Sequence, residues 1–292
     1  MRNRGIQKMK TISLAAAFLV SGAPVFAQVG YVTTSGSGAG DGSSWGDAYA
    51  GVSTALTNAS SDGYDELWVQ QGTYTVVDGL LDTGIAIYGG FAGTESALGD
   101  RDWQNNTTTL ESDGTARVIR LLADTRLDGF TVTGGDAAGS SYQPGYGGGV
   151  LIYYASGAVL ENCTITGNSS KQGGGIAIRN NVQDNTNPEQ ILNCTISNND
   201  MNVADGYGAG VSILEKGYAE FTSCTLQNNS MSAEAKWDVG GGGAVAQFSW
   251  SNGPAETTFT NCEFIGNAAT DDGGAITVYS SDASLTNSVI LD

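Results

Sequence analysis

A nine-residue motif built around a cysteine recurs four times in this 292-residue chain and limits the folds that it can adopt. The first copy reads Leu160-Glu-Asn-Cys163-Thr-Ile165-Thr-Gly-Asn168. An internal period of roughly 20–50 residues is typical of solenoid and array proteins. The other full copies run from Ile191 to Asn199, from Phe221 to Asn229 and from Phe259 to Asn267, and weaker copies begin at Leu127 and Leu285.

A glycine-rich motif alternates with the cysteine motif, first as Gly147-Gly-Gly-Val150-Leu-Ile152. Its apolar residues share one parity, which predicts a strand with one buried face. The lengths between motifs vary, so insertions are expected in loops between stacked coils. We therefore predict an all-β fold, a right-handed parallel β-helix. Further copies of the glycine motif begin at Gly173, Gly208, Gly242 and Gly273.

The cysteine motif also predicts a tight corner in each coil. Its apolar residues Leu160, Cys163 and Ile165 break the two-residue period once, and a bend at Asn162 explains the break. Asparagine tolerates the left-handed conformation better than other non-glycine residues, so the equivalent positions should stack as a ladder. These positions are Gly129, Asn162, Asn193, Ser223, Asn261 and Asn287.

The four cysteines occupy equivalent inward positions of neighbouring coils, which lie about 4.8 Å apart in a parallel stack. Their number and an exported context also allow disulfides. Parallel Cβ vectors fit disulfide geometry poorly, so we favour a column of buried thiols. The column comprises Cys163, Cys194, Cys224 and Cys262.

Residues 1–27 have the features of a signal peptide. Basic residues precede an apolar run from Ile12 to Val20, and Val25-Phe-Ala27 resembles a cleavage site. The run is too short to cross ~30 Å of hydrocarbon, so we expect a secreted or cell-surface protein with no membrane span in the mature chain.

The mature chain divides into an N-terminal cap region, residues 28–65, and the β-helix, residues 66–292. A short helix that places Val52, Ala55, Leu56 and Ala59 on one face is expected to cap the first coil. The chain stops inside a recurring motif at Val289–Asp292, so we expect the C-terminal end to be truncated, with further coils and a cap beyond it.

Composition excludes several functions. Without residues 1–27 the chain keeps eight basic and thirty acidic residues, which argues against nucleic-acid partners and anionic membranes. The sequence contains no histidine, which excludes a Ser-His-Asp triad and histidine-bearing zinc sites.

Two resemblances to known families follow from these motifs. Gly273-Gly-Ala-Ile276 together with Phe264-Ile-Gly-Asn267 resembles the GGAI and FxxN repeats of the chlamydial polymorphic outer membrane proteins. The segments Asp41–Trp45, Tyr88–Ala92 and Arg101–Trp103 are similar to the N-terminal region of large secreted bacterial β-helix repeat proteins. The resemblances imply a β-helix and a surface role such as adhesion, but nothing in this chain resembles the autotransporter barrel of the chlamydial proteins.

An enzyme is the alternative to a binding protein. Asn198-Asn-Asp200 and Asp271-Asp272 match two polygalacturonase elements in form, but the Gly-His-Gly and Arg-x-Lys elements are absent. A calcium-dependent lyase needs a carboxylate cluster beside a basic residue, here Lys171 or Arg179. Ordinary turn chemistry explains the same aspartates. Calcium is therefore the one cofactor that the sequence suggests. Its candidate ligands are Asp205, Asp238, Asp271 and Asp272.

The hypothesis that the protein binds glycans depends on aromatic side chains, which stack on sugar faces. Tyr153 and Tyr279 occupy the same outward position of the glycine motif, with Arg179 between them, and Trp237 and Trp250 lie in inserted loops. We expect a non-enzymatic secreted or surface protein that binds glycans or cell-surface proteins. A polysaccharide-degrading enzyme, lyase before hydrolase, is the alternative.

Overall fold

The computed structural model describes residues 27–139, 143–180, 187–201, 203–204, 206–232, 241–249, 253–270 and 273–291. Apart from Ala27, the predicted signal peptide lies outside this part. Among the described residues, no helix combines the length and apolar character needed to cross a membrane.

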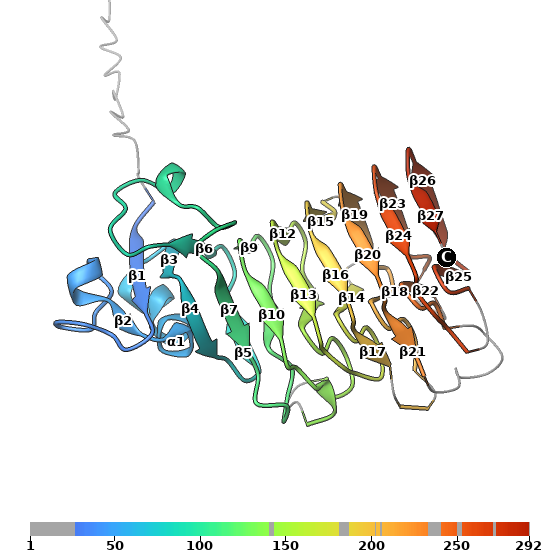
Figure 1. The fold of residues 1–292 in the computed structure, drawn as a ribbon, viewed down its shortest axis with the longest axis horizontal. Helices are drawn as coiled ribbons and strands as arrows, with labels where there is room; N and C mark the ends of the chain where they lie inside the picture. The colour runs from blue at the N-terminus through green and yellow to red at the C-terminus, as the bar shows by residue number, and fades with distance from the viewer. Residues whose placement is uncertain are drawn as a thin grey trace, which may run out of the picture.

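Three long parallel sheets wind into a right-handed β-helix, with one strand of each sheet in a regular coil (Figure 1). The ten-stranded sheet, sheet A, is ordered β2-β1-β3-β6-β9-β12-β15-β19-β23-β26. Its strands are β1 (Val29–Thr33), β2 (Tyr49–Ala50), β3 (Glu66–Gln70), β6 (Ala86–Phe91), β9 (Arg126–Asp128), β12 (Val159–Glu161), β15 (Glu189–Leu192), β19 (Tyr218–Thr222), β23 (Glu256–Thr260) and β26 (Asp282–Thr286).

The eight-stranded sheet, sheet B, follows the asparagine corner of each coil. It comprises β4 (Gly72–Thr75), β7 (Thr108–Glu111), β10 (Thr131–Thr133), β13 (Thr164–Thr166), β16 (Thr195–Ser197), β20 (Thr225–Gln227), β24 (Glu263–Ile265) and β27 (Val289–Leu291).

The glycine motifs form the seven-stranded sheet C. Its strands are β5 (Gly79–Leu81), β8 (Ile119–Leu121), β11 (Val150–Tyr153), β14 (Ile176–Asn180), β18 (Val211–Glu215), β22 (Val245–Phe248) and β25 (Ile276–Tyr279). The motif needs glycine because neighbouring coils approach closely there: a Cβ on Gly174 would lie 2.4 Å from the carbonyl oxygen of Asp200.

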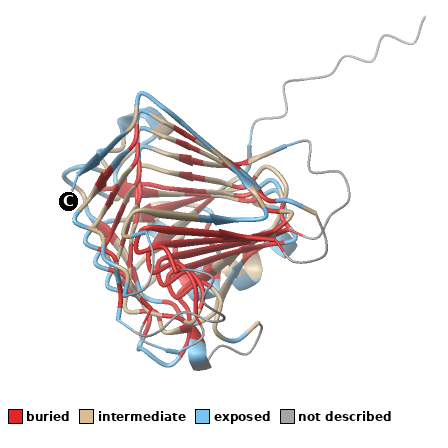
Figure 2. Cartoon of the chain, turned by 90° about the vertical axis from the view of Figure 1, so that its right-hand side faces the viewer, coloured by how far each residue is buried: buried red, intermediate tan, exposed pale blue. Residues whose placement is uncertain are grey.

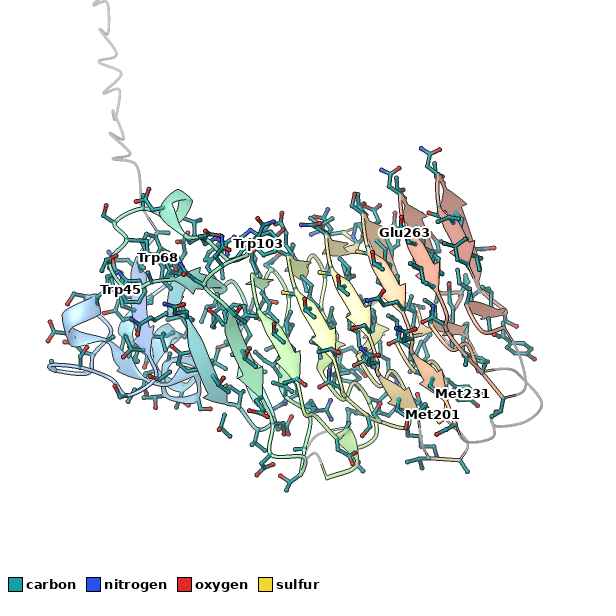
Figure 3. All side chains as sticks on the ribbon, viewed as in Figure 1. Trp45, Trp68, Trp103, Met201, Met231 and Glu263 are labelled. Carbon is teal, nitrogen blue, oxygen red and sulfur yellow. The ribbon has the colours of Figure 1, made fainter. Side chains whose placement is uncertain are left out.

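The three sheets enclose one apolar core, seen along the coil axis in Figure 2. Leu160, Cys163 and Ile165 all point into it and are buried, as the sequence pattern predicts. A small two-stranded sheet, β17 (Asp200–Met201) and β21 (Ser230–Met231), lies outside the main core. Its two methionines form a separate buried cluster with Ala209 (Figure 3).

The predicted corner ladder is confirmed. All six positions have positive φ, from 48° at Asn287 to 82° at Gly129. The amides are linked across coils, since Asn193 Nδ2 donates to Asn162 Oδ1 at 2.7 Å and Asn162 Nδ2 donates to Asp128 Oδ1 at 2.9 Å.

The four cysteines are free and buried, so the structure contains the thiol column rather than disulfides. Each Sγ donates to a main-chain carbonyl of the preceding coil. Cys224 Sγ, for example, lies 3.2 Å from the carbonyl oxygen of Ile191. Each thiol therefore satisfies its weak donor inside an apolar core.

The expected capping helix is α1, Val52–Asp62, at the N-terminal end of the solenoid (Figure 1). Val52, Ala55 and Ala59 are buried against the core, and Leu56 packs at its edge. The helix ends at Gly63, whose φ of 83° provides a left-handed C-cap. Three short 3₁₀ helices, η1 (Trp45–Asp47), η2 (Leu98–Asp100) and η3 (Ala137–Gly139), lie in connecting loops.

Candidate functional site

The predicted row Tyr153, Arg179 and Tyr279 exists, but most of it is not an open surface. Strand register pairs Tyr153 with Arg179 and Phe248 with Tyr279. Tyr153 is only 7% exposed and Phe248 is fully buried. The expectation that this face of sheet C displays its aromatic residues is therefore wrong for Tyr153.

Loops that precede the glycine motifs cover this face. Tyr207 packs on Phe248 with ring centroids 4.3 Å apart, and Tyr146 lies beside Leu151 and Tyr153. Apolar residues on the outer side of sheet C thus form small cores of their own. Because this outward row is covered, some copies of the glycine motif also carry apolar residues at outward positions, such as Leu151, Ala177 and Leu214.

Arg179 is held within this cover. Its Nη2 donates to Glu215 Oε1 at 2.9 Å, and its guanidinium lies 5.3 Å from the centroid of the Tyr146 ring. Burial, the largest single effect, lowers the pKa of Arg179, but the hydrogen bond to Glu215 and the electrostatic effects of Tyr146, Glu215 and Tyr153 together raise this pKa above its ordinary value. Arg179 is a structural cation here. Tyr279, in contrast, is 43% exposed in the last coil.

The predicted calcium ligands Asp205, Asp238, Asp271 and Asp272 lie outside the described residues, as do Trp237 and Trp250. Among the residues that the structure does describe, no three carboxylates or thiols are grouped so that they could hold a metal ion. Asn198 has a φ of 53° and stands at a bend, and Asp200 begins β17, so the Asn-x-Asp element forms the connection from β16 to β17.

An open cavity of about 330 Å³ lies at the N-terminal end of the tyrosine row. It is formed at the ends of β5, β8 and β11, on the outer side of sheet C. We call it the tyrosine groove. Its lining consists of Leu80, Thr83, Arg120, Leu121, Leu122, Ala123, Tyr153 and Tyr154.

A buried ion-pair network supports one wall of the groove. Asp78 Oδ1 lies 3.0 Å from Arg120 Nε and 3.1 Å from Nε of the buried Arg117. Arg117 also donates to the carbonyl oxygen of Gln143 at 2.6 Å, and Gln143 Nε2 donates to Tyr153 Oη at 3.1 Å. Residues distant in sequence therefore fix the orientation of Tyr153 and Arg120.

Tyr154 provides the exposed surface of the groove. Its side chain is 47% exposed, and its ring lies edge-on to that of Tyr153 at a centroid distance of 4.1 Å. Its φ of 51° places it in the left-handed region, the conformation that Glu215 and Ser280 also adopt at the ends of β18 and β25, so Tyr154 stands at a recurring turn of the coil. The groove thus combines an aromatic face, aliphatic walls and one guanidinium.

Comparison with known proteins agrees with this fold. Residues 105–290 match the family described as "Right handed beta helix region". The chain belongs to this family. Among curated proteins, none matches it. The crystal structure of Escherichia coli YbhC is similar with a TM-score of 0.49 and 12% identity, over 98% of this chain and 88% of that one.

Sequence reasoning missed two features of this right-handed β-helix. The first is the groove residues Leu80, Arg120 and Tyr154, for which the Tyr153-Tyr154 doublet was the only available signal. The second is an asparagine ladder at the end of each cysteine motif, which is buried in the first three motifs and partly buried in the fourth. The conserved spacing within the motif contained this signal, because the same residue type closes four copies: Asn168, Asn199, Asn229 and Asn267.

Proposed function

We propose that this right-handed β-helix is an exported protein that binds glycans without cleaving them, with the tyrosine groove as its binding site. The observation that supports this most directly is the exposed ring of Tyr154 above an aliphatic cavity. Tyrosine rings present an apolar face to sugar C–H groups and a polar hydroxyl at the rim.

The size and lining of the groove support a small-molecule or sugar ligand. Ligand pockets typically have volumes of roughly 300–1,000 Å³ and a few polar groups on mostly apolar walls. The groove has about 330 Å³, with Arg120 and Thr83 as its polar side chains beside the two tyrosines. Because Asp78 pairs with Arg120, the site carries little net positive charge, which favours neutral glycans over strongly anionic ones.

The lining also favours binding over hydrolysis. Glycoside hydrolases generally use a pair of carboxyl groups that flank the scissile bond. The described lining of the groove contains no aspartate or glutamate. A retaining or inverting mechanism therefore has no acid or base in this cavity, whereas stacking and hydrogen bonding need none.

Glycan binding to the mature chain, measured by calorimetry after an array screen, tests the proposal. We expect Tyr154→Ala to weaken binding about tenfold, because the loss of one aromatic contact costs about 1.4 kcal/mol of binding free energy. Tyr279→Ala is the matched control, because Tyr279 is similarly exposed but lies outside the groove. Equal affinities of the two variants would exclude the groove as the site.

The lyase alternative makes a different prediction. A calcium-dependent lyase releases an unsaturated, ultraviolet-absorbing product from uronate polymers, and chelation of calcium stops the release. We expect no such product from the mature chain. Product formation that a chelator abolishes would replace the binding proposal with an enzymatic one.

A further inference from the structure

A second cavity, of about 340 Å³, lies at the corner between sheets A and B, away from the tyrosine groove. Trp103 on the loop after η2 forms one side of it (Figure 3), and strands β10 and β13 form the other. We call it the Trp103 cleft. Its lining consists of Trp103, Gln104, Thr107, Thr108, Gly129, Phe130, Thr131, Asn162 and Thr164.

Two glycines make room for the tryptophan. A Cβ on Gly90 would lie 2.5 Å from Trp103 Cα, and a Cβ on Gly129 would lie 3.0 Å from Trp103 Cβ. Gly129 stands at the corner position that Asn162 and Asn193 occupy in the next coils. The glycine in this coil thus leaves the corner open for the loop, which a side chain would displace.

Arg101 anchors the same loop. Its Nη2 lies 2.7 Å from Asp128 Oδ1, and its Nη1 donates to the carbonyl oxygens of Gly89 and Asp128 at 3.1 and 3.2 Å. Its guanidinium also lies 5.1 Å from the centroid of the Tyr88 ring. Because the loop is fixed by charge and packing, Trp103 is positioned before any ligand arrives, which lowers the entropic cost of binding.

Several polar groups of the cleft make no hydrogen bond within the described part of the chain. Trp45 Nε1 donates to Glu95 O and Trp68 Nε1 donates to Glu66 Oε2, but Trp103 Nε1 has no partner among the described residues. The hydroxyls of Thr131 and Thr164 likewise make no hydrogen bond within the described part of the chain. The amide of Asn162 is already bonded within the corner ladder, so the cleft presents an indole, an indole N–H, the hydroxyls of Thr131 and Thr164 and the amide of Gln104.

From this arrangement we propose that the Trp103 cleft is a second binding site, specific for a neutral sugar ring of a glycan. No charged side chain belongs to the described lining, so neither an anionic nor a cationic ligand gains an ion pair there. The indole supplies a stacking face, and the hydroxyls of Thr131 and Thr164 and the amide of Gln104 supply donors and acceptors for sugar hydroxyls. The proposal is independent of the tyrosine groove, because the two sites share no residue.

The test follows the indole N–H of Trp103 by ¹⁵N-correlated NMR of the mature chain, with its cross-peak assigned from Trp103→Phe. The probes are maltohexaose, cellohexaose and xylohexaose, each added to about 10 mM, which is tenfold above the Kd of a weak millimolar site. We expect a saturable shift with at least one of them, and the same shift in Tyr154→Ala. A cross-peak that all three leave unmoved would falsify the proposal.

A matched pair of threonine variants separates binding from stability. Thr164→Val removes a hydroxyl of the cleft, whereas Thr225→Val removes the equivalent hydroxyl two coils further along sheet B. We expect Thr164→Val to weaken binding of the hexasaccharide about fivefold or more, with Thr225→Val at the wild-type affinity and both variants at similar thermal stability. Equal affinities of the two variants would refute the assignment of the hydroxyl to the site.

Discussion

The side-chain amide of Asn199 links its coil to the preceding coil, because it hydrogen-bonds to the main chain at Asn168 and Ile165. Asn199 Oδ1 accepts the main-chain N–H of Asn168 at 3.1 Å, and Asn199 Nδ2 donates to the carbonyl oxygen of Ile165 at 2.9 Å. Asn229 makes the same two bonds to the coil of Asn199. The buried ladder therefore satisfies main-chain groups at the turn that follows sheet B.

Replacing Asn199 with alanine should destabilise the β-helix by about 3 kcal/mol. The change leaves the buried N–H of Asn168 and the carbonyl of Ile165 without partners, and each unsatisfied group costs roughly 1–3 kcal/mol. Urea unfolding followed by circular dichroism measures the loss. Asn193→Gly is the control, because Asn193 lies in the exposed corner ladder and glycine keeps the left-handed backbone. A loss for Asn199→Ala no larger than for the control would contradict this account.

Glu189 should make the protein less stable as pH rises. Its side chain is fully buried in sheet A, neither carboxyl oxygen has a hydrogen-bond partner among the described residues, and its register neighbour is Ala219. Burial raises the pKa of Glu189 to about 8 from an ordinary value of 4.5. Between these two values the unfolded chain releases the proton and the folded chain keeps it, so the free energy of unfolding falls with rising pH.

The Glu189→Gln variant tests this prediction, since a neutral amide removes the titration. At pH 7 it should be more stable than the wild type, by an amount on the order of 2 kcal/mol, and at pH 4 the difference should disappear. Urea midpoints measured from pH 4 to pH 9 provide the comparison. Parallel pH profiles for the two proteins would show that Glu189 does not titrate as described.

The thiol column should be chemically silent in the folded protein. The four cysteines are buried in the core, where a reagent in solution cannot reach their sulfur atoms, and burial raises the pKa of the Cys194 thiol well above its ordinary value. A chromogenic disulfide reagent should modify no cysteine in native protein and all four after denaturation. Fast labelling of any cysteine under native conditions, or fewer than four reactive thiols after denaturation, would contradict the free and buried column.

The single serine of the corner ladder should be a weak point. Ser223 has a φ of 56° between the asparagines of the neighbouring coils. We expect Ser223→Asn to raise the melting temperature, because asparagine tolerates this conformation and its amide can join Asn193 and Asn261. Ser223→Val should lower stability by about 1–2 kcal/mol, because a β-branched side chain clashes in the left-handed region. The reverse order in thermal unfolding would contradict this view of the corner.

Positions that repeat in every coil could be predicted from the sequence. The corner at Asn162, the inward thiol of Cys163 and the strand of Val150 each recur at equivalent places, so one local rule applies to several coils at once. The capping helix is also local, because the apolar side of Val52 to Ala59 follows from helical spacing alone. Backbone sterics and the burial of one face decide all of these features, and both act over a few residues.

The two candidate sites could not be predicted in this way. Tyr153 shares an outward position with Tyr279, yet Tyr153 is buried where Tyr146 packs beside it, whereas Tyr279 is exposed. The loops take their paths from contacts between distant residues, such as the bond from Arg117 to the carbonyl of Gln143, 26 positions later.

The sequence by itself determined the coil, its corner, its thiol column and its cap, because each depends on short-range periodicity. Only the tertiary structure decided which outward side chains meet solvent. A loop closes one part of sheet C and leaves the tyrosine groove open, and the anchor of Arg101 on Asp128 positions Trp103 beside the corner glycine. These placements depend on long-range packing and ion pairs, which no local pattern in the chain encodes.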